Sequence, residues 1–437
     1  MILKRKILLP LSILFLAAQL FPQTNPIAVK GALIYPISGE PINNGVLIVQ
    51  DKKIVSVGKA DEIEIPNSAE VIDASGKVIL PGLIDTHSHI GEGSGGDASS
   101  PTNPEVRILD AIDPMSDSFK KALAGGITTV NVMPGSGHLM SGQTVYLKLR
   151  KAKIINEMLF CGDIQNGICG GMKMANGTNS IRNNPPFPGT RAKSVAIIRQ
   201  LFIKAQEYKK KIEEAAGDES KMPKRDLEME ALVQVLNGER IVHHHTHRAD
   251  DIMTVLRLAD EFGFKVVLHH VTEGWKVADE IAKAGVPCSI IMIDSPGGKY
   301  EAINLAYKTG SVLEKAGIDV AYHTDDGITD SRFFIRSAAF GVRAGMSREK
   351  ALEAITLAGA RMLGLDDRIG SLEKGKDADF IILSGDPFSD YTKVEQTWIE
   401  GEKVFDRSNP EDKKFATGGY EVFRGDLQHA DICGGLE

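Results

Sequence analysis

The stretch Pro81-Gly-Leu-Ile-Asp-Thr-His-Ser-His89 runs from apolar residues into two histidines that lie two positions apart. Alternate side chains of an extended strand point to the same face, so His87 and His89 project together. Two imidazole nitrogens on one face supply half of a tetrahedral metal site. If the strand belongs to a parallel barrel, these residues lie at the strand end where active sites form. Because a His-x-His pair alone is a weak signal, its meaning depends on the rest of the chain.

Three further apolar runs end in ionisable side chains. In Ile241-Val-His-His-His-Thr-His247, strand alternation places histidines 243, 245 and 247 on one face and His244 on the other. In Val266-Val-Leu-His-His270 the two histidines are expected to point to opposite sides, and Val320-Ala-Tyr-His-Thr-Asp-Asp326 ends in acidic groups. Ten of the 11 histidines lie between positions 87 and 323. Four strands that end this way favour one shared metal site over separately buried side chains.

The middle of the chain has the pattern of a parallel sheet. From Gly82 to about Leu365, short apolar strands alternate with longer helical patterns, which indicates repeated βα units. The clearest predicted strands are Gly82–Asp85, Ile127–Val132, Arg240–His245, Lys265–His270, Val286–Met292 and Ile318–His323. The predicted helices between them include Ala249–Phe262, Trp275–Ala284, Ala302–Ala316 and Ser347–Leu363.

Both ends of the chain have β character instead. Short β-like runs separated by turn residues fill the chain from Ile27 to Leu80 and return after Ile369. We expect these outer segments to pack together beside the barrel. The 437 residues are therefore predicted to form an α/β protein with a (β/α)8 TIM barrel over residues 81–368. A small β-sandwich domain would be built from both chain ends, residues 25–80 and 369–407, and residues 408–437 would form a tail without assigned function.

The N-terminus has the layout of a secretory signal peptide. Lys4, Arg5 and Lys6 precede a short apolar stretch, 7–21, that is too short for a comfortable membrane span. We predict that residues 1–24 are removed, that the protein is secreted or periplasmic, and that no stable membrane insertion remains. An uncleaved anchor is the alternative, because no Ala-x-Ala site follows the apolar stretch. Removal changes the formal charge from −7 to −10, which argues against a nucleic-acid partner.

The four cysteines are too few and too scattered for a disulfide scaffold or a cysteine-rich zinc module. In an oxidising compartment Cys161 and Cys169 could pair, although free buried thiols are the more common outcome. The sequence leaves this question open.

Taken as a set, these motifs resemble those of the amidohydrolase superfamily of metal-dependent hydrolases, over roughly Ile27 to Phe405. The stretch 81–89 is similar to the family's first-strand motif, and 369–381 is similar to its return into a small β domain. Within the superfamily, the chain looks closest to the imidazolonepropionase-like and metallo-dipeptidase branch. That likeness rests on Met172-Lys-Met-Ala-Asn-Gly177 and His247-Arg-Ala-Asp-Asp-Ile252.

The resemblance implies six metal ligands: His87, His89, Lys173, His245, His270 and Asp325. Within the histidine run, His247 is the alternative to His245. Lys173 is similar to a position at which some members carry a carboxylated lysine that bridges two metals, whereas related branches use one metal and no such lysine. The implied cofactor is one or two divalent ions per chain, and nitrogen and oxygen ligands favour zinc.

The implied reaction is hydrolysis of a non-terminal or cyclic amide C–N bond by a metal-activated hydroxide. Asp325 would accept the proton of the water and pass it to the leaving nitrogen. His270 or His247 would polarise the carbonyl and stabilise the oxyanion. Three arginines are candidates for holding the carboxylate of a small-molecule or short-peptide substrate: Arg248, Arg332 and Arg336.

Two alternatives stay open at this point. Within the enzymes, a metallo-dipeptidase or prolidase-like peptidase competes with a cyclic amidase, and a secretion signal disfavours imidazolonepropionase itself because histidine degradation is a cytoplasmic task. From another class, a non-catalytic metal-binding protein could be built on a degenerate barrel, although the filled ligand positions argue against it. The sequence leaves the substrate, the metal count and a homo-oligomeric state undecided.

Overall fold

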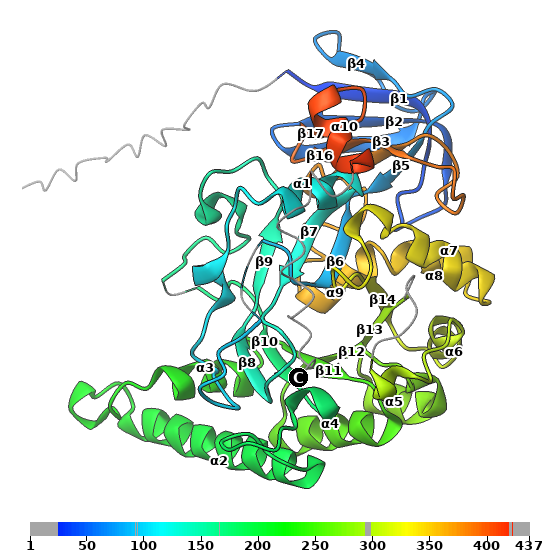
Figure 1. The fold of residues 1–437 in the computed structure, drawn as a ribbon. Coiled ribbons are helices and arrows are strands. Elements are labelled where there is room, and N and C mark those ends of the chain that lie inside the picture. Colours follow the sequence, from blue (N-terminus) through cyan, green and yellow to red (C-terminus); the bar gives the residue numbers. More distant parts are fainter. Residues whose placement is uncertain are drawn as a thin grey trace, which may run out of the picture.

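The computed structural model describes residues 25–91, 93, 95–165, 167–292, 299–418 and 422. The predicted signal peptide, 1–24, and most of the predicted tail lie outside the described residues. In Figure 1, the first and last parts of the described chain form one sheet at the top, and strands flanked by helices lie below it. The functional question therefore concerns the lower part, where the histidine-bearing strands are found.

The upper sheet is built from both ends of the described chain. Its strands are β1 (Ile27–Ile34), β2 (Ile42–Gln50), β3 (Lys53–Lys59), β4 (Glu70–Asp73), β5 (Val78–Pro81), β15 (Phe380–Leu383), β16 (Val394–Ile399) and β17 (Glu402–Asp406). They follow the order β17-β16-β15-β5-β1-β2-β3, and β4 pairs with β1. The two ends join where β15 runs antiparallel to β5, with Phe380 opposite Pro81. The buried ring of Phe380 stacks on Trp398 at a centroid distance of 5.4 Å.

The lower strands form two sheets. They are β6 (Leu83–Ser88), β7 (Ile127–Val132), β8 (Met140–Gln143), β9 (Val145–Lys148), β10 (Met172–Ala175), β11 (Val242–Thr246), β12 (Val266–His270), β13 (Cys288–Ile291) and β14 (Val320–His323). The strand orders are β14-β13-β12-β11-β10-β8 and β6-β7-β9. Strands β10 to β14 are parallel neighbours, and β6 is parallel to β7. Every residue of β6 and of β10 to β14 is buried, as expected for parallel strands covered by helices.

Hydrogen bonds hold the end of β14 against β6. The backbone N–H of Asp325 donates to the carbonyl oxygen of His87 at 2.9 Å. The backbone N–H and the hydroxyl of Thr324 donate to the Asp85 carboxylate at 3.0 and 2.5 Å. Burial raises the pKa of Asp85 to about 7, although the hydrogen bonds from Thr324 oppose this. These contacts bring the first and the last of the histidine-bearing strands together.

Helices lie around these strands (Figure 1). The α-helices are α1 (Asp117–Ala124), α2 (Arg191–Ala215), α3 (Leu227–Leu236), α4 (Ala249–Phe262), α5 (Ala278–Ala284), α6 (Thr309–Lys315), α7 (Arg336–Arg343), α8 (Arg348–Glu353), α9 (Leu357–Leu363) and α10 (Pro410–Thr417). Short 3-10 helices are η1 (Ile108–Ala111), η2 (Ile155–Met158), η3 (Gly177–Ser180), η4 (Glu219–Lys221), η5 (Gly274–Lys276), η6 (Tyr300–Ala302) and η7 (Ser331–Phe333). Among the described residues, none of these helices is both long enough and apolar enough to cross a bilayer.

The six clearest predicted strands are all present, and α4 has the predicted bounds. The prediction of one helix over 347–363 is wrong, because Thr356 leaves the helical region (φ −137°, ψ −98°) between α8 and α9. Its hydroxyl donates to the carbonyl oxygen of Leu352 at 2.6 Å. The predicted helix 302–316 is wrong in its first half, because only its second half, α6, is α-helical. Strands β8 and β9 were not predicted.

Cys161 and Cys169 form a disulfide, which decides the question that the sequence left open. The bond closes a short loop in the connection between β9 and β10. The buried Cys288 is a free thiol.

Candidate active site

Four side chains, one from within β10 and the others from the ends of β6 and β14, converge in one place. The Nε2 atoms of His87 and His89 lie 3.3 Å apart. Asp325 Oδ1 lies 3.4 Å from the first of these nitrogens and 3.1 Å from the second. Lys173 Nζ lies 3.2 Å from His87 Nε2, and each of the four residues is at most 7% exposed. The structure thus brings together four of the six predicted ligands within hydrogen-bonding distances.

The other two predicted ligands lie directly beside this group. His270 Nδ1 is 3.9 Å from Asp325 Oδ2 and 3.1 Å from His323 Nε2. The ring of His245 lies 4.3 Å from that of His270, and the ring of His247 lies 5.1 Å from it, measured between centroids. His245 and His247 therefore share a face, as strand alternation predicted.

The prediction that His269 and His270 point to opposite sides is wrong. Both rings contact His87, with centroid distances of 5.0 and 4.7 Å. The extended conformation ends at His270, where φ is 68°, and Val271 follows with φ 48°. This left-handed conformation is uncommon for residues with a side chain, and it turns His270 inward beside His269. Asp325 also has a positive φ, 49°, and such positions concentrate at active sites.

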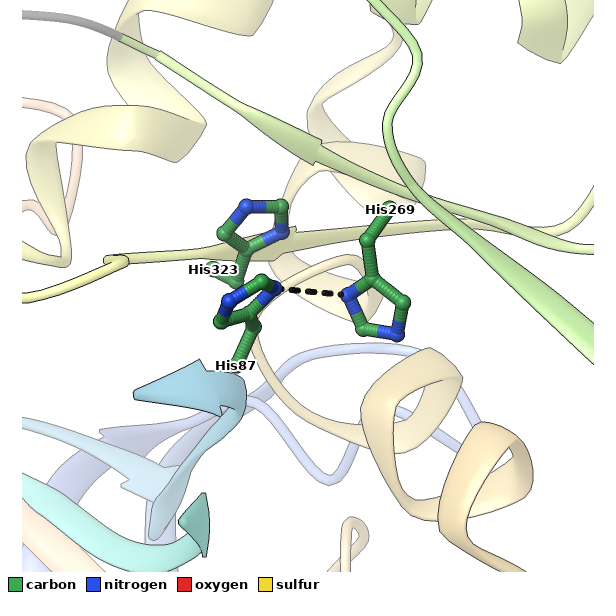
Figure 2. A group of neighbouring side chains, drawn as sticks. All are labelled: His87, His269 and His323. Carbon is green, nitrogen blue, oxygen red and sulfur yellow. Dashed lines mark hydrogen bonds between the residues drawn. The ribbon is translucent and has the colours of Figure 1, made fainter. Parts of the chain in front are cut away.

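A second row of buried side chains contacts the Nδ1 side of the His87 ring. Figure 2 shows His87, His269 and His323 converging from three strands, with His87 Nδ1 directed at His269 Nδ1 at 3.3 Å. His269 Nε2 in turn lies 3.0 Å from His243 Nδ1, and His243 Nε2 lies 2.8 Å from the Tyr146 hydroxyl. This row fixes the orientation of the His87 ring and leaves its Nε2 on the side of Asp325.

Burial keeps seven imidazoles of the cluster neutral, and the Asp325 carboxylate is charged. Burial lowers the pKa of His87, His245, His269 and His270 well below the ordinary histidine value, and lowers that of His243, His247 and His323 to about 3. Burial alone would raise the pKa of Asp325, but the hydrogen bond from His89 and the electrostatic interactions with His89, His323 and Lys173 outweigh it and bring that pKa below its usual range. Neutral imidazole and carboxylate are the forms that bind metals.

The donor atoms fit a divalent cation. Two ligands that bind one zinc ion at 2.0–2.1 Å in a tetrahedron lie about 3.3 Å apart. The distances among His87 Nε2, His89 Nε2 and Asp325 Oδ1, 3.1–3.4 Å, match this spacing. Around them, buried polar atoms are without hydrogen-bond partners among the described residues, namely His270 Nε2 and both ring nitrogens of His245. Buried polar atoms without partners are costly, so their presence in one cluster indicates a ligand.

The three arginines proposed for substrate binding are each engaged elsewhere. Arg248 donates to both carboxylate oxygens of Asp250 at 2.9 Å, at the exposed start of α4. Arg332 pairs with Asp330, and the Arg336 guanidinium lies over the Phe333 ring, 4.1 Å from its centroid. Their role in holding a carboxylate stays a prediction.

Sequence reasoning missed two residues near the cluster. Glu301, in η6 after β13, has a carboxylate oxygen within 4.8 Å of ring nitrogens of His245 and His247. No sequence motif surrounds Glu301. Only its position in the loop after β13 could have suggested that it reaches the site. Tyr146 lies in β9, a strand that was itself not predicted.

Comparison with known proteins places the chain in a family. A model described as "Amidohydrolase family" matches residues 199–405. The crystal structure of an amidohydrolase from Thermotoga maritima MSB8 is 36% identical, with a TM-score of 0.81, over 87% of this chain and 100% of that one. The chain belongs to the amidohydrolase superfamily. It is accordingly a metal-binding hydrolase of carbon–nitrogen bonds with a TIM-barrel-like α/β fold.

Two curated relatives refine this membership. Imidazolonepropionase from Rhizobium rhizogenes is 26% identical over 80% of this chain and 89% of its own length, which supports the imidazolonepropionase-like branch of the amidohydrolases. "Amidohydrolase tasK" from Hapsidospora irregularis is 26% identical over 87% of this chain. This chain spans only 43% of the length of that protein.

Proposed function

We propose that this amidohydrolase is a secreted or periplasmic zinc enzyme that cleaves a non-terminal or cyclic amide bond. The observation that carries the proposal is the convergence of His87 Nε2, His89 Nε2 and Asp325 Oδ1 within 3.1–3.4 Å of one another in a buried site. The proposal also includes a closed (β/α)8 barrel and a β-sandwich form for the upper domain. The hydrogen bonds between the ends of β6 and β14 support closure.

The ligands that would hold the cation are the six predicted from the resemblance: His87, His89, Lys173, His245, His270 and Asp325. Lys173 is the least ordinary member, because a lysine ammonium is a cation itself. It is fully buried, and its Nζ lies 3.2 Å from His87 Nε2. Carboxylation of Lys173 would replace this positive charge by a negative one and allow it to bridge two ions. A bound cation would supply Lewis-acid activation of a water and of the substrate carbonyl.

The chain's own residues would carry the proton. Asp325 is ionised and lies at the centre of the site, so it can take a proton from water and return it to the leaving nitrogen. His247 is neutral, and its Nδ1 is fixed by the Thr272 hydroxyl at 2.7 Å. Its Nε2 is buried without a partner among the described residues. This nitrogen, or that of His270, would donate to the developing oxyanion.

The substrate would be a small molecule or a short peptide-like amide. A metallo-dipeptidase or prolidase-like activity is the second candidate, since a dipeptide presents the same amide together with a carboxylate. Arg248 and Arg332 are proposed to bind that carboxylate. The two candidates differ in whether the substrate is a dipeptide or another non-terminal or cyclic amide.

The test is metal analysis of protein purified without chelators, followed by assays on a library of dipeptides and cyclic amides. We expect at least one divalent ion per chain, mainly zinc, and hydrolysis within one of the two substrate groups. The His87→Ala variant should lose both the ion and the activity. Asp390 is an exposed carboxylate, and its control variant Asp390→Asn should keep both. A wild-type protein without stoichiometric metal, together with an unchanged His87→Ala, would contradict the proposal.

Export is supported by the basic and apolar N-terminus and by the Cys161–Cys169 disulfide, a bond that persists in oxidising compartments. Intact-mass measurement on the exported protein tests it. We expect a chain that begins near residue 25, and a membrane-bound chain that keeps residues 1–24 would favour the anchor.

A further inference from the structure

Three loops meet around His138, a histidine that lies outside the donor cluster. The loops follow β6, β7 and β10, strands whose ends carry or contact that cluster. Gly96 belongs to the first loop, His138 to the second, and Arg182 and Phe187 to the third. In folds of this kind the active site is built from the loops that follow the strands. Side chains that meet here are therefore placed to contact a substrate.

His138 is buried, yet its ring has no hydrogen-bond partner. The side chain is 3% exposed, and neither ring nitrogen has a partner among the described residues. The first loop packs against the ring, because a Cβ on Gly96, whose φ is +119°, would lie 2.9 Å from His138 Nδ1. Burial, together with the charge of Arg182, lowers the pKa of His138 to about 4. The imidazole is thus neutral at pH 7 and keeps one N–H to donate to a ligand.

Arg182 supplies a positive charge beside this ring. Its Nη2 donates to the carbonyl oxygen of Gly137 at 3.0 Å, next to His138 in the chain. Its guanidinium lies 4.0 Å from the centroid of the Phe187 ring, and the His138 ring lies 5.4 Å from the same centroid. Phe187 therefore contacts both side chains and holds the guanidinium and the imidazole near each other.

The charge of Arg182 is not neutralised by a neighbouring carboxylate. Among the described residues Arg182 forms no ion pair, whereas Arg248 is paired with an aspartate. Asp97 is exposed, and its Oδ1 accepts the backbone N–H of Ser99 at 2.8 Å. The charge of Asp97 acts on His138 more weakly than that of Arg182 does. The electrostatic environment of the ring therefore favours an anion.

This pair of side chains lies close to the donor cluster. The carbonyl oxygen of Met133, at the start of the loop after β7, lies 2.8 Å from His89 Nδ1. The carbonyl oxygen of Leu139, at the end of that loop, accepts the N–H of Ala175 at 3.1 Å. Ala175 lies two residues, or about 7 Å along a strand, beyond Lys173. Such a separation suits a small substrate that places its amide at the cluster and its charged end at this pair.

We propose that Arg182 and His138 bind a carboxylate of the substrate. A guanidinium can donate two N–H groups to the two oxygens of a carboxylate, and the imidazole can add one more. The ring face of Phe187 supports the guanidinium on one side. The inference rests on the proposed function and deepens it, because it specifies an amide that carries a free carboxylate as the substrate class.

The test is calorimetric binding to the full-length, zinc-loaded Asp325→Asn protein, in which slow turnover leaves the ligand intact. The probes are N-acetyl-alanine, with one amide and one carboxylate, and its neutral carboxamide. We expect the acid to bind at least about tenfold more tightly, and Arg182→Gln in the same background to abolish this preference. Arg182→Lys should keep part of it, because the charge stays while the planar fork is lost. The matched control Arg199→Gln, at an exposed arginine, should keep all of it.

A second variant tests the histidine separately. His138→Leu removes the N–H donor and should reduce the preference for the acid by about threefold to tenfold. His138→Gln keeps an N–H donor and should restore part of the loss. Because His138→Leu replaces a buried polar group without a partner by an apolar one, its melting temperature should not fall below that of the wild type. A loss of binding in this variant would then not be caused by unfolding.

The outcomes separate this inference from the proposed function. If no library substrate is hydrolysed but the acid binds through Arg182, the proposed reaction fails and the carboxylate site stands. The inference is overturned if the zinc-loaded protein binds neither probe or binds both equally, or if Arg182→Gln keeps the preference for the acid. Hydrolysis of an amide together with any of these results would uphold the proposed function and exclude this pair.

Discussion

Two buried polar clusters of this protein differ in how completely their groups are paired. The first surrounds Lys148 of β9, whose Nζ lies 2.5 Å from Asp377, 2.9 Å from Asp379 and 3.4 Å from Glu400. It joins the lower strands to the upper sheet. The second is the histidine cluster at the strand ends, where His245, His247 and His270 keep buried nitrogens without partners among the described residues.

This difference in pairing indicates that the Lys148 cluster stabilises the fold and that the histidine cluster binds a ligand. Around Lys148 each charge has an opposite charge beside it, and the surrounding cations lower the pKa of Asp377 and Glu400 to about 2 despite burial. In such a cluster the opposite charges neutralise one another without a ligand. The histidine cluster is costly as it stands, because desolvated nitrogens lack hydrogen bonds, and a bound cation would relieve that cost. Changes in the first cluster should therefore affect stability, and changes in the second should affect metal binding and turnover.

The largest effect on stability is expected from Lys148→Met. The change leaves the carboxylates of Asp377, Asp379 and Glu400 without their shared cation in a buried place. Removing one partner of a buried ion pair costs about 3–5 kcal/mol. Urea unfolding of the metal-free protein measures this cost. An unfolding free energy within 1 kcal/mol of the wild type, on the order of a surface ion pair, would show that the cluster is not structural.

A smaller effect, on metal binding, is expected from Lys173→Met, because Lys173 lies among the proposed metal ligands and not in the Lys148 cluster. We predict zinc affinity lower by about 10- to 100-fold at the proposed metal site. Dialysis against zinc measures it, with the exposed Lys120→Met as the control. Wild-type zinc affinity in Lys173→Met would remove this lysine from the metal site.

His244 gives a prediction for pH, since it lies on the outer face of β11, away from the cluster. Burial lowers its pKa to about 4, from 6.5 in the unfolded chain. The folded protein thus resists protonation of His244 between these values, so the unfolding free energy falls as the pH falls from about 6.5 to 4. His244→Asn should reduce this slope by up to about 1.4 kcal/mol per pH unit. Above pH 7 the unfolding free energies of the variant and the wild type should change with pH in parallel. Equal slopes of the unfolding free energy against pH below 6.5 would contradict the account.

The smallest effect is expected from Arg248→Ala. Its ion pair with Asp250 is exposed, so the unfolding free energy should change by less than about 1 kcal/mol. If Arg248 also holds a substrate carboxylate, KM for dipeptides should rise by about fivefold while kcat stays unchanged. Steady-state kinetics on the best substrate of the library decide this. An unchanged KM would exclude Arg248 from the substrate site.

Much of the fold follows from the sequence because strand alternation and apolar runs are local signals. The face shared by His87 and His89, and the outward direction of His244, needed only the period of a strand. His270 could not be placed in this way, because its positive φ depends on the tertiary contacts at the strand end. Thr356 likewise interrupts a region of continuous helical pattern.

Residues of the candidate site could be predicted where a sequence motif surrounds them. They could not be predicted where only the folding of the chain brings them to the site. The proposed ligands His87, His89, His270 and Asp325 each lie at the end of a strand with a recognisable pattern. Glu301 reaches the cluster through a loop, and its carboxylate fits there because residue 177 is a glycine. The Cys161–Cys169 pair depended on how the chain between β9 and β10 folds back.

The central claim is that Asp325 carries the proton in a metal-dependent cleavage of an amide. The most direct measurement compares kcat of the wild type and of Asp325→Asn, both loaded with zinc, on the substrate identified in the library. The account predicts that the wild type hydrolyses the amide and that the variant is slower by about 10²- to 10⁴-fold. Hydrolysis by Asp325→Asn at the wild-type rate would contradict it.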